Sequence, residues 1–361
     1  IFPQYDWTMQ ILGERADEVE VTLLMKNGSD LHSYQPTVWD MVKISEADLF
    51  LYVGGVSDFW VADALTNTKN PDQEAMDLLD MLQDSLKVHE HDHDHGHNEE
   101  TCTIHDHGEE TEYDEHIWLS LHNAGTACEE IAEVLCKLDS EYADVYQKNL
   151  MSYTEKLDAL DLEYHETAEH AEQKVLLFGD RYPFRYLLED YGLSYYAAFE
   201  GCSAETEASF ETITTLATKA DELDLPVVLA IDGSDQKIAR TIADNTRTRD
   251  QKVLVLDSMQ SVSEEDIRNG ENYLSIMEQN LDFYKTKKLN QMTQTEWLEV
   301  STLVFALPGY LTSLALPQMM EKKFGRILLF GGTRTDTINS FKTKDIVSNL
   351  SIDSSILKVT A

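Results

Sequence analysis

The chain has 361 residues, 42% of them hydrophobic, and its 67 acidic and 28 basic side chains give a formal net charge of −39. This length predicts two or three domains, and the apolar share suffices for sizeable cores. The strong negative charge argues against nucleic acid and anionic membrane surfaces as partners.

The first 88 residues alternate short apolar runs with helical patterns. Residues 19–25 (VEVTLLM) and 47–53 (ADLFLYV) are expected to form buried parallel strands, and residues 37–46 and 72–86 to form helices. Strands that alternate with helices predict an α/β layer architecture.

Residues 89–112 break this pattern, with seven histidines, nine acids and no base. Such a run cannot bury a core, so it is expected to be a solvated loop. Alternating imidazoles and carboxylates suit Zn²⁺ and its neighbours. Weak metal sites are therefore expected at His89, His91, His93, His95, His97, His105 and His107.

A short helix near residues 123–138 precedes a long one at about residues 139–173. Between Tyr142 and Ala168, apolar side chains recur every three or four positions, which is typical of a helix with one buried stripe. At about 1.5 Å per residue, this helix would be on the order of 50 Å long. It therefore suits a connection between an N-terminal lobe, residues 1–138, and a second lobe.

The second lobe, residues 174–289, repeats the α/β alternation. Its strands are expected at 174–178, 195–199, 226–231 and 252–257, and its helices at 184–191, 209–224, 236–245 and 267–287. The chain contains no G-x-G sequence, which argues against a dinucleotide fingerprint.

Two further histidines lie in distinctive segments of the first lobe, one near its start and one near its end. His32 lies in GSDLHSYQPT (28–37), and His116 lies in DEHIWL (114–119), just after the histidine-rich loop. This order resembles the zinc- and manganese-binding solute-receptor family of bacterial ABC transporters, over about residues 1–289. The family has a Gly-x-x-x-His-x-Tyr-x-Pro-Thr segment, a histidine-rich loop in zinc-preferring members, and then Asp-x-His-x-Trp-Leu. The resemblance implies two α/β lobes joined by one long helix, with metal bound in the cleft.

Carried over residue by residue, the resemblance makes His32 and His116 the two N-lobe ligands and Asp232 an acidic ligand from the C-lobe. Most zinc-preferring members place a third histidine after the strand that corresponds to residues 175–178, but this sequence has none there. The third ligand is therefore left open between Asp180, a glutamate and water. The candidate glutamates are Glu205 and Glu207.

The resemblance implies an extracytoplasmic receptor, a periplasmic protein or surface lipoprotein, that binds zinc and delivers it to an ABC permease as a monomer. It also implies that IFPQYDW (1–7) is the end of a first strand with its turn, and that a signal region is missing. Manganese is the alternative ion, and a metal sink or surface adhesin is the alternative use of the site. No HExxH sequence or nucleophile elbow favours an enzyme, whether metallohydrolase or vestigial oxidoreductase.

The tail, residues 290–361, differs in charge from the rest. Residues 291–361 hold 7 bases and 6 acids, a net of +1, so the first 290 residues carry −40. TQTEWLEV and ALPQMMEKKFGRILLFGG resemble an internal fragment of the short-chain dehydrogenase family. The tail lacks both the nucleotide-binding glycines and a Tyr-x-x-x-Lys sequence, so it is expected to be a non-functional fragment.

Overall fold

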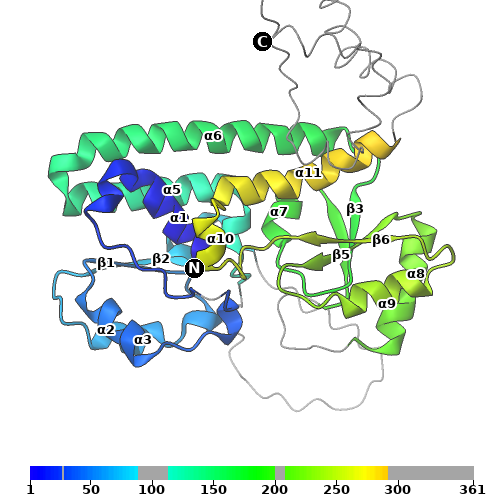
Figure 1. Ribbon diagram of the computed structural model, residues 1–361, viewed down its shortest axis with the longest axis horizontal. Helices are drawn as coiled ribbons and strands as arrows, with labels where there is room; N and C mark the ends of the chain where they lie inside the picture. The colour runs from blue at the N-terminus through cyan, green and yellow to red at the C-terminus, as the bar shows by residue number, and fades with distance from the viewer. Residues whose placement is uncertain (27, 88–112, 200–207, 292–361) are drawn as a thin grey trace, which may run out of the picture. The chain divides into compact units, whose positions relative to one another are not determined.

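The computed structural model describes residues 1–26, 28–87, 113–199 and 208–291 (Figure 1). The chain divides into one unit of residues 1–286 and another of residues 287–361, and the first unit is described below. The histidine-rich loop, Glu205, Glu207 and nearly all of the tail lie outside the described residues. The expectations for them stay predictions.

The N-terminal lobe has a sheet of two parallel strands, β1 (Leu49–Tyr52) and β2 (Glu74–Asp77). Its helices are α1 (Phe2–Leu12), α2 (Val38–Glu46), α3 (Val61–Thr66) and α4 (Leu78–Met81). The predicted helix at 37–46 is confirmed as α2. It begins at a capping box in which Thr37 and Asp40 satisfy each other's backbone N–H groups.

Three expectations for this lobe are wrong. Residues 19–25 form no strand, although Leu23 and Met25 are buried, because an apolar run can pack into a core without a ladder partner. Residues 2–12 form α1 rather than a strand end and turn. The helix expected at 72–86 is replaced by β2 and the short α4, since pairing with β1 overrides the local helical pattern.

The C-terminal lobe has a parallel sheet in the order β4-β3-β5-β6. Its strands are β3 (Val175–Phe178), β4 (Ser194–Ala197), β5 (Val227–Ile231) and β6 (Lys252–Leu256). Its helices are α7 (Arg185–Asp190), α8 (Phe210–Glu222), α9 (Lys237–Asn245), α10 (Glu264–Arg268) and α11 (Tyr273–Gln291). The four predicted strands are confirmed. The single helix expected at 267–287 is instead α10 and α11, separated at Gly270, whose φ is +100°.

The strand order places Asp180 and Asp232 at a point where the direction of the chain through the sheet reverses. β3 lies between β4 and β5. The chain passes from β3 to β4 on one side and then crosses back to β5 on the other side. The carboxyl ends of parallel strands at such a point form the usual crevice for ligands in an open α/β sheet. Asp180 and Asp232 follow these two strands.

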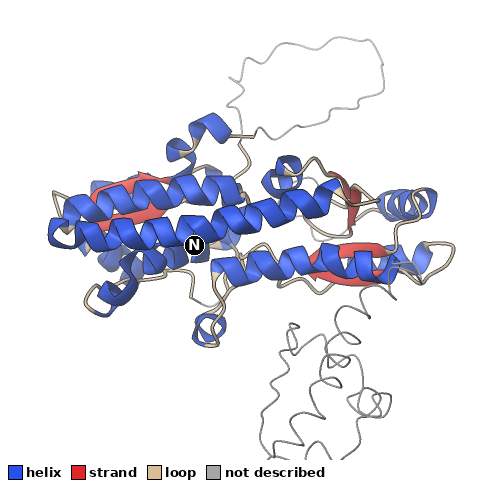
Figure 2. Cartoon of the chain, turned by 90° about the horizontal axis from the view of Figure 1, so that it is seen from above, coloured by secondary structure: helices blue, strands red, loops and turns tan. Residues whose placement is uncertain are grey.

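The long helix α6 (Ala143–Glu169) confirms the predicted connection, though it is shorter at both ends. It packs against α1 and α5 (Leu121–Leu138), and its predicted stripe is buried. It also reaches the C-terminal lobe, where the Tyr164 hydroxyl donates to the Met277 carbonyl of α11 at 2.6 Å. Figure 1 shows α6 passing above both sheets, and the view from above shows the long helices running in one general direction (Figure 2).

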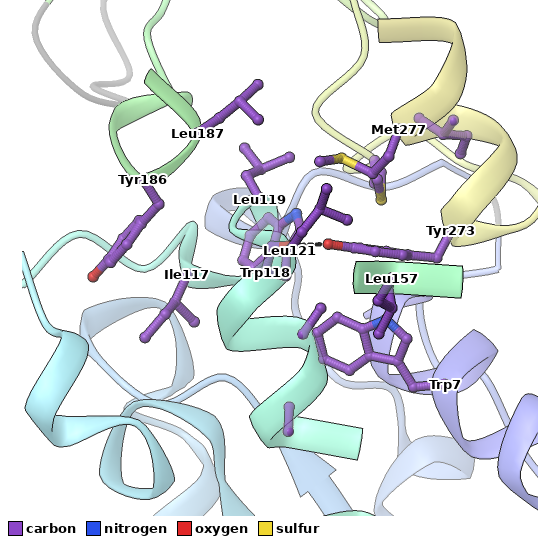
Figure 3. Packing of buried hydrophobic residues seen from close by; sticks show 14 of the residues in the cluster. Trp7, Ile117, Trp118, Leu119, Leu121, Leu157, Tyr186, Leu187, Tyr273 and Met277 are labelled. Atoms are coloured by element: carbon purple, nitrogen blue, oxygen red, sulfur yellow. Dashed lines mark hydrogen bonds between the residues drawn. The ribbon is translucent and has the colours of Figure 1, made fainter. Parts of the chain in front are cut away.

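One hydrophobic core joins the two lobes (Figure 3). The rings of Trp7 and Tyr273 meet edge to face with centroids 5.2 Å apart, and the Tyr273 hydroxyl donates to the Trp118 carbonyl at 2.7 Å. The Trp118 indole in turn donates to the carbonyl of Ser258, in the C-terminal lobe, at 3.0 Å. Shared packing of this kind restricts the lobes to small relative movements. Within the described ranges, no helix is both long and apolar enough to cross a membrane.

A buried carboxylate links α1 to α11 and gives a test of this shared core. Asp6 accepts a hydrogen bond from the Tyr273 backbone N–H at 3.0 Å, and burial raises the pKa of its carboxyl group. The stability that its protonated form provides is complete below the unfolded pKa of about 3.9 and is lost as the pH rises through the folded pKa.

We therefore expect Asp6→Asn, which keeps an acceptor for Tyr273, to raise the urea midpoint of unfolding at about pH 8. Between about pH 4 and about pH 8, the midpoint should decrease less with rising pH in this variant than in the wild type. Urea unfolding followed by tryptophan fluorescence measures both effects. Asp6→Ala leaves the buried N–H unpaired and should cost about 1–3 kcal/mol at either pH. An Asn variant with the wild-type pH dependence would contradict this role for Asp6.

Candidate metal centre

The structure brings His32 and His116 together from segments 84 residues apart in the sequence. His32 lies in a 3-10 turn, Leu31–Ser33, and His116 stands at the start of another, Ile117–Leu119. Their Nε2 atoms are 3.2 Å apart. The side chain of His116 is 1% exposed and that of His32 is 24% exposed, so one imidazole lies in the core and the other at its edge.

Both imidazoles are held through their other nitrogen. His116 Nδ1 lies 2.7 Å from Asp114 Oδ1, and because a carboxylate only accepts, Nδ1 carries the proton. His32 Nδ1 lies 2.8 Å from Ser57 Oγ, and that hydroxyl donates its own proton to Glu115. The hydroxyl must therefore accept from His32 Nδ1–H.

In their neutral forms, the two rings then direct Nε2 lone pairs at each other. Lone pairs at this separation repel unless a cation lies between or beside them. Two imidazoles on a tetrahedral Zn²⁺, with Zn–N bonds of about 2.0–2.1 Å, place their nitrogens about 3.3–3.4 Å apart. The observed 3.2 Å is close to that spacing. The separation of the two nitrogens is therefore compatible with both imidazoles binding one zinc ion.

A buried glutamate supports the His32 side of this pair. Glu115 accepts from both the backbone N–H of Ser57, at 2.7 Å, and the Ser57 hydroxyl. A Cβ at Gly55, whose φ is +74°, would lie 2.4 Å from Glu115 Oε1, so a side chain there would strain the backbone and displace the glutamate. Ser57, Glu115 and Asp114 were not among the residues expected at the site. The two acids directly precede His116 and could have been found, whereas nothing in the sequence singles out Ser57.

The two acids of the C-terminal lobe are satisfied within that lobe. Asp232 accepts four hydrogen bonds, from the N–H and hydroxyl groups of Ser258, both at 2.6 Å, and of Ser261, at 3.0 and 2.5 Å. Asp180 accepts two, from the Arg181 N–H at 2.9 Å and from the Ser234 hydroxyl.

In the part of the chain that the structure describes, no group of three or more His, Cys, Asp or Glu side chains surrounds a common point. The structure therefore assembles His32 with His116 but does not gather Asp180 or Asp232 around them.

A further acid lies beside Asp232. Burial, and then the neighbouring charge of Asp232, raise the pKa of Asp257 to about 7. Near neutral pH, Asp232 and Asp257 together therefore carry less than the full negative charge of two carboxylates. No motif or spacing in the sequence singles out Asp257.

The loop before His32 contacts the segment after β6, in which Ser258 and Ser261 donate hydrogen bonds to Asp232. Gly28 has a φ of +65°, and a Cβ there would lie 2.5 Å from the Ser261 carbonyl oxygen. Close by, the Glu264 N–H donates to the Lys26 carbonyl at 3.0 Å. The glycine of the GSDLH sequence therefore permits a close approach of the two lobes.

Two α/β lobes joined by α6, with an imidazole pair on turns of the first lobe that contact the second, are typical of the class of two-lobed metal receptors. The family described as zinc-uptake complex component A, periplasmic, matches residues 1–286, and the chain belongs to this family. The resemblance inferred for residues 1–289 is thereby confirmed. Because the match ends at residue 286, the dehydrogenase resemblance of the tail stays a prediction.

Individual relatives agree with this assignment. The zinc-binding lipoprotein AdcA of Streptococcus pneumoniae (TIGR4) is 32% identical over 298 residues, which are 82% of this chain and 55% of AdcA. The chain thus spans about half the length of that relative. The high-affinity zinc uptake protein ZnuA of Bacillus subtilis (strain 168) is 31% identical over 291 residues, which are 80% of this chain and 86% of ZnuA.

Solved structures confirm the predicted fold class. The Zn(II)-bound ZnuA-like domain of S. pneumoniae AdcA has a TM-score of 0.60 and 28% identity, covering 79% of this chain and 95% of that domain. The metal-dependent lipoprotein YcdH of B. subtilis has a TM-score of 0.63 and 28% identity, covering 79% and 96%. The fold is the α/β metal-receptor type of periplasmic binding protein.

The close approach at Gly28 can be tested against a matched glycine. Gly192 has nearly the same φ, +63°, but a Cβ there meets nothing within 4 Å. We expect Gly28→Ala to lower the free energy of unfolding more than Gly192→Ala, by on the order of 1 kcal/mol or more, because only Gly28 adds a clash to the backbone strain. Chemical denaturation of both variants measures the difference. Equal costs would contradict the contact with Ser261.

Proposed function

We propose that this protein captures one divalent transition-metal ion, preferably zinc, between its lobes and delivers it to an ABC permease outside the cytoplasm. The observation that carries the proposal is the His32–His116 pair, with Nε2 atoms 3.2 Å apart and both Nδ1 atoms held. Membership of the zinc-uptake family and the zinc-named relatives support the same conclusion.

The remaining ligands would come from the C-terminal lobe. An ionised carboxylate offers about four lone-pair positions, and Asp232 uses four while Asp180 uses two. Asp180 is therefore the easier of the two to recruit, and Asp232 would have to exchange hydroxyl donors for the ion. Glu205 and Glu207 are the alternatives to Asp180, and the loop histidines would bind further ions weakly.

A shell of four protein ligands suits carriage of the ion rather than catalysis on it. A catalytic zinc site keeps an open position for water, which a filled shell does not offer. The proposed role is therefore that of a monomeric receptor and not of an enzyme. Two imidazoles favour zinc, whereas a site richer in carboxylates would suit manganese. A metal sink or an adhesin would use the same site.

The two histidines are tested by competition titration. We expect the full chain to bind one zinc ion against a chelator strong enough to strip the loop sites, and His32→Ala or His116→Ala to abolish that binding. Each variant removes one of two imidazoles that hold the ion directly. His165→Ala is the control, since His165 is exposed on α6. Unchanged zinc affinity in both site variants would overturn the assignment.

The two acids are tested in the same assay. Asp180→Asn and Asp232→Asn keep the side-chain volume and an acceptor but remove the charge. We expect each to weaken zinc binding by about tenfold or more if its carboxylate binds the ion, which corresponds to about 1.4 kcal/mol. Thermal unfolding of the metal-free variants serves as the control for folding. A variant with wild-type affinity would remove that residue from the ligand set and direct attention to Glu205 or Glu207.

A further inference from the structure

The turn that carries each histidine begins with an aspartate that accepts the histidine's backbone N–H. Asp30 precedes His32 by two positions, and Asp114 precedes His116 by two. In both cases, Oδ1 of the aspartate accepts the backbone N–H of the histidine at 2.9 Å. Each aspartate therefore fixes the beginning of the turn that carries an imidazole.

The second oxygen of each aspartate faces an arginine from one segment of the C-terminal lobe. Arg181 Nη1 lies 2.6 Å from Asp30 Oδ2, and Arg185 Nε lies 3.6 Å from Asp114 Oδ2. One stretch of five residues, at the carboxyl end of β3, thus contacts both histidine-bearing turns. Arg181 also directly follows Asp180 and donates its backbone N–H to the Asp180 carboxylate.

The two ion pairs differ in their access to water. The side chains of Asp114 and Arg185 are 1% and 12% exposed, whereas those of Asp30 and Arg181 are 24% and 28% exposed. Separating a buried pair leaves an uncompensated charge in the core, which is strongly unfavourable. A partly exposed pair can be separated at modest cost because water and salt compensate its charges.

We propose that Arg181 is a positioning residue whose ion pair with Asp30 forms a reversible latch between the lobes. The latch holds the His32 turn against the Asp180 segment and so sets the rate at which a bound ion leaves. Opening it frees the more exposed His32 while His116 stays fixed by Asp114 and Arg185. This inference rests on the proposed function, because it concerns release from the same site.

The test is a zinc release rate, measured on the full chain loaded with zinc and mixed rapidly with excess chelator. Ions on the loop leave first, so the slow phase reports the tight site. We expect Arg181→Gln to accelerate the slow phase about three- to tenfold, with little change in the association rate or in the unfolding midpoint of the metal-free protein. Asp30→Asn keeps the acceptor for the His32 N–H and should have the same effect.

Three comparisons separate a latch from a merely structural contact. The double variant should release zinc no faster than either single one, since both remove the same interaction. Added salt should accelerate release from the wild type but not from Arg181→Gln. Arg247→Gln is the matched control, because Arg247 pairs with Asp221 inside the C-terminal lobe, and it should leave release unchanged.

The outcomes distinguish the two proposals. A wild-type chain that binds zinc tightly, with Arg181→Gln and Asp30→Asn releasing it at the wild-type rate, overturns the latch and leaves the proposed function standing. A wild-type chain that holds no tight zinc overturns both. Equal acceleration by Arg247→Gln would also overturn the latch, since the effect would then follow from lost charge in general.

Discussion

The structure depends on one electrostatic constraint, which is that two imidazoles direct their Nε2 atoms at each other while both Nδ1 protons are engaged elsewhere. Asp114 holds one ring, and Ser57, oriented by Glu115, holds the other. A histidine pair left to itself would turn one ring to donate to the other. Because the Nδ1–H groups donate to a carboxylate directly or through a hydroxyl, neither Nε2 of the neutral pair carries a proton to share, and the pair favours a cation. The glycine at position 55 follows from this arrangement, since Glu115 occupies the space of its side chain.

The shared core explains why release would be a local event. A large hinge movement would have to separate Trp118 from the Ser258 carbonyl and Tyr273 from Trp118, and both hydrogen bonds are buried. Such a movement would expose aromatic surface and leave polar groups unpaired. The partly exposed contacts between the lobes, such as Asp30 with Arg181, open at far less cost. We therefore expect the lobes to act as a rigid frame and the turn around His32 to be its adjustable part.

Much of this fold follows from the sequence, and the exceptions have physical causes. The stripe of α6 and the four strands around Asp180 and Asp232 are strong periodic signals, and the histidine pair follows from a family resemblance carried by two short motifs. No strand forms at residues 19–25, because burial alone does not decide whether a segment pairs with a neighbouring strand. Ser57 gave no signal at all, because its role comes from a contact with Glu115, 58 residues away. The arginine contacts were equally hidden, since they join segments that only the folded chain brings together.

The difference in burial between His116 and His32 also suggests an order in which the proposed ligands would take up an ion. His116 lies in the core beside a buried aspartate, so it is already in position before an ion arrives, whereas His32, whose side chain is 24% exposed, can still adjust. The serine hydroxyls around Asp232 can rotate away, but the backbone N–H groups of Ser258 and Ser261 cannot, so that carboxylate would remain partly neutralised when it binds an ion. Asp180 keeps more of its acceptor capacity, and it is joined to the latch through the next residue in the chain. An ion would then be held first by the imidazoles and last by Asp180, and the same connection would let a loosened latch weaken Asp180 and His32 together.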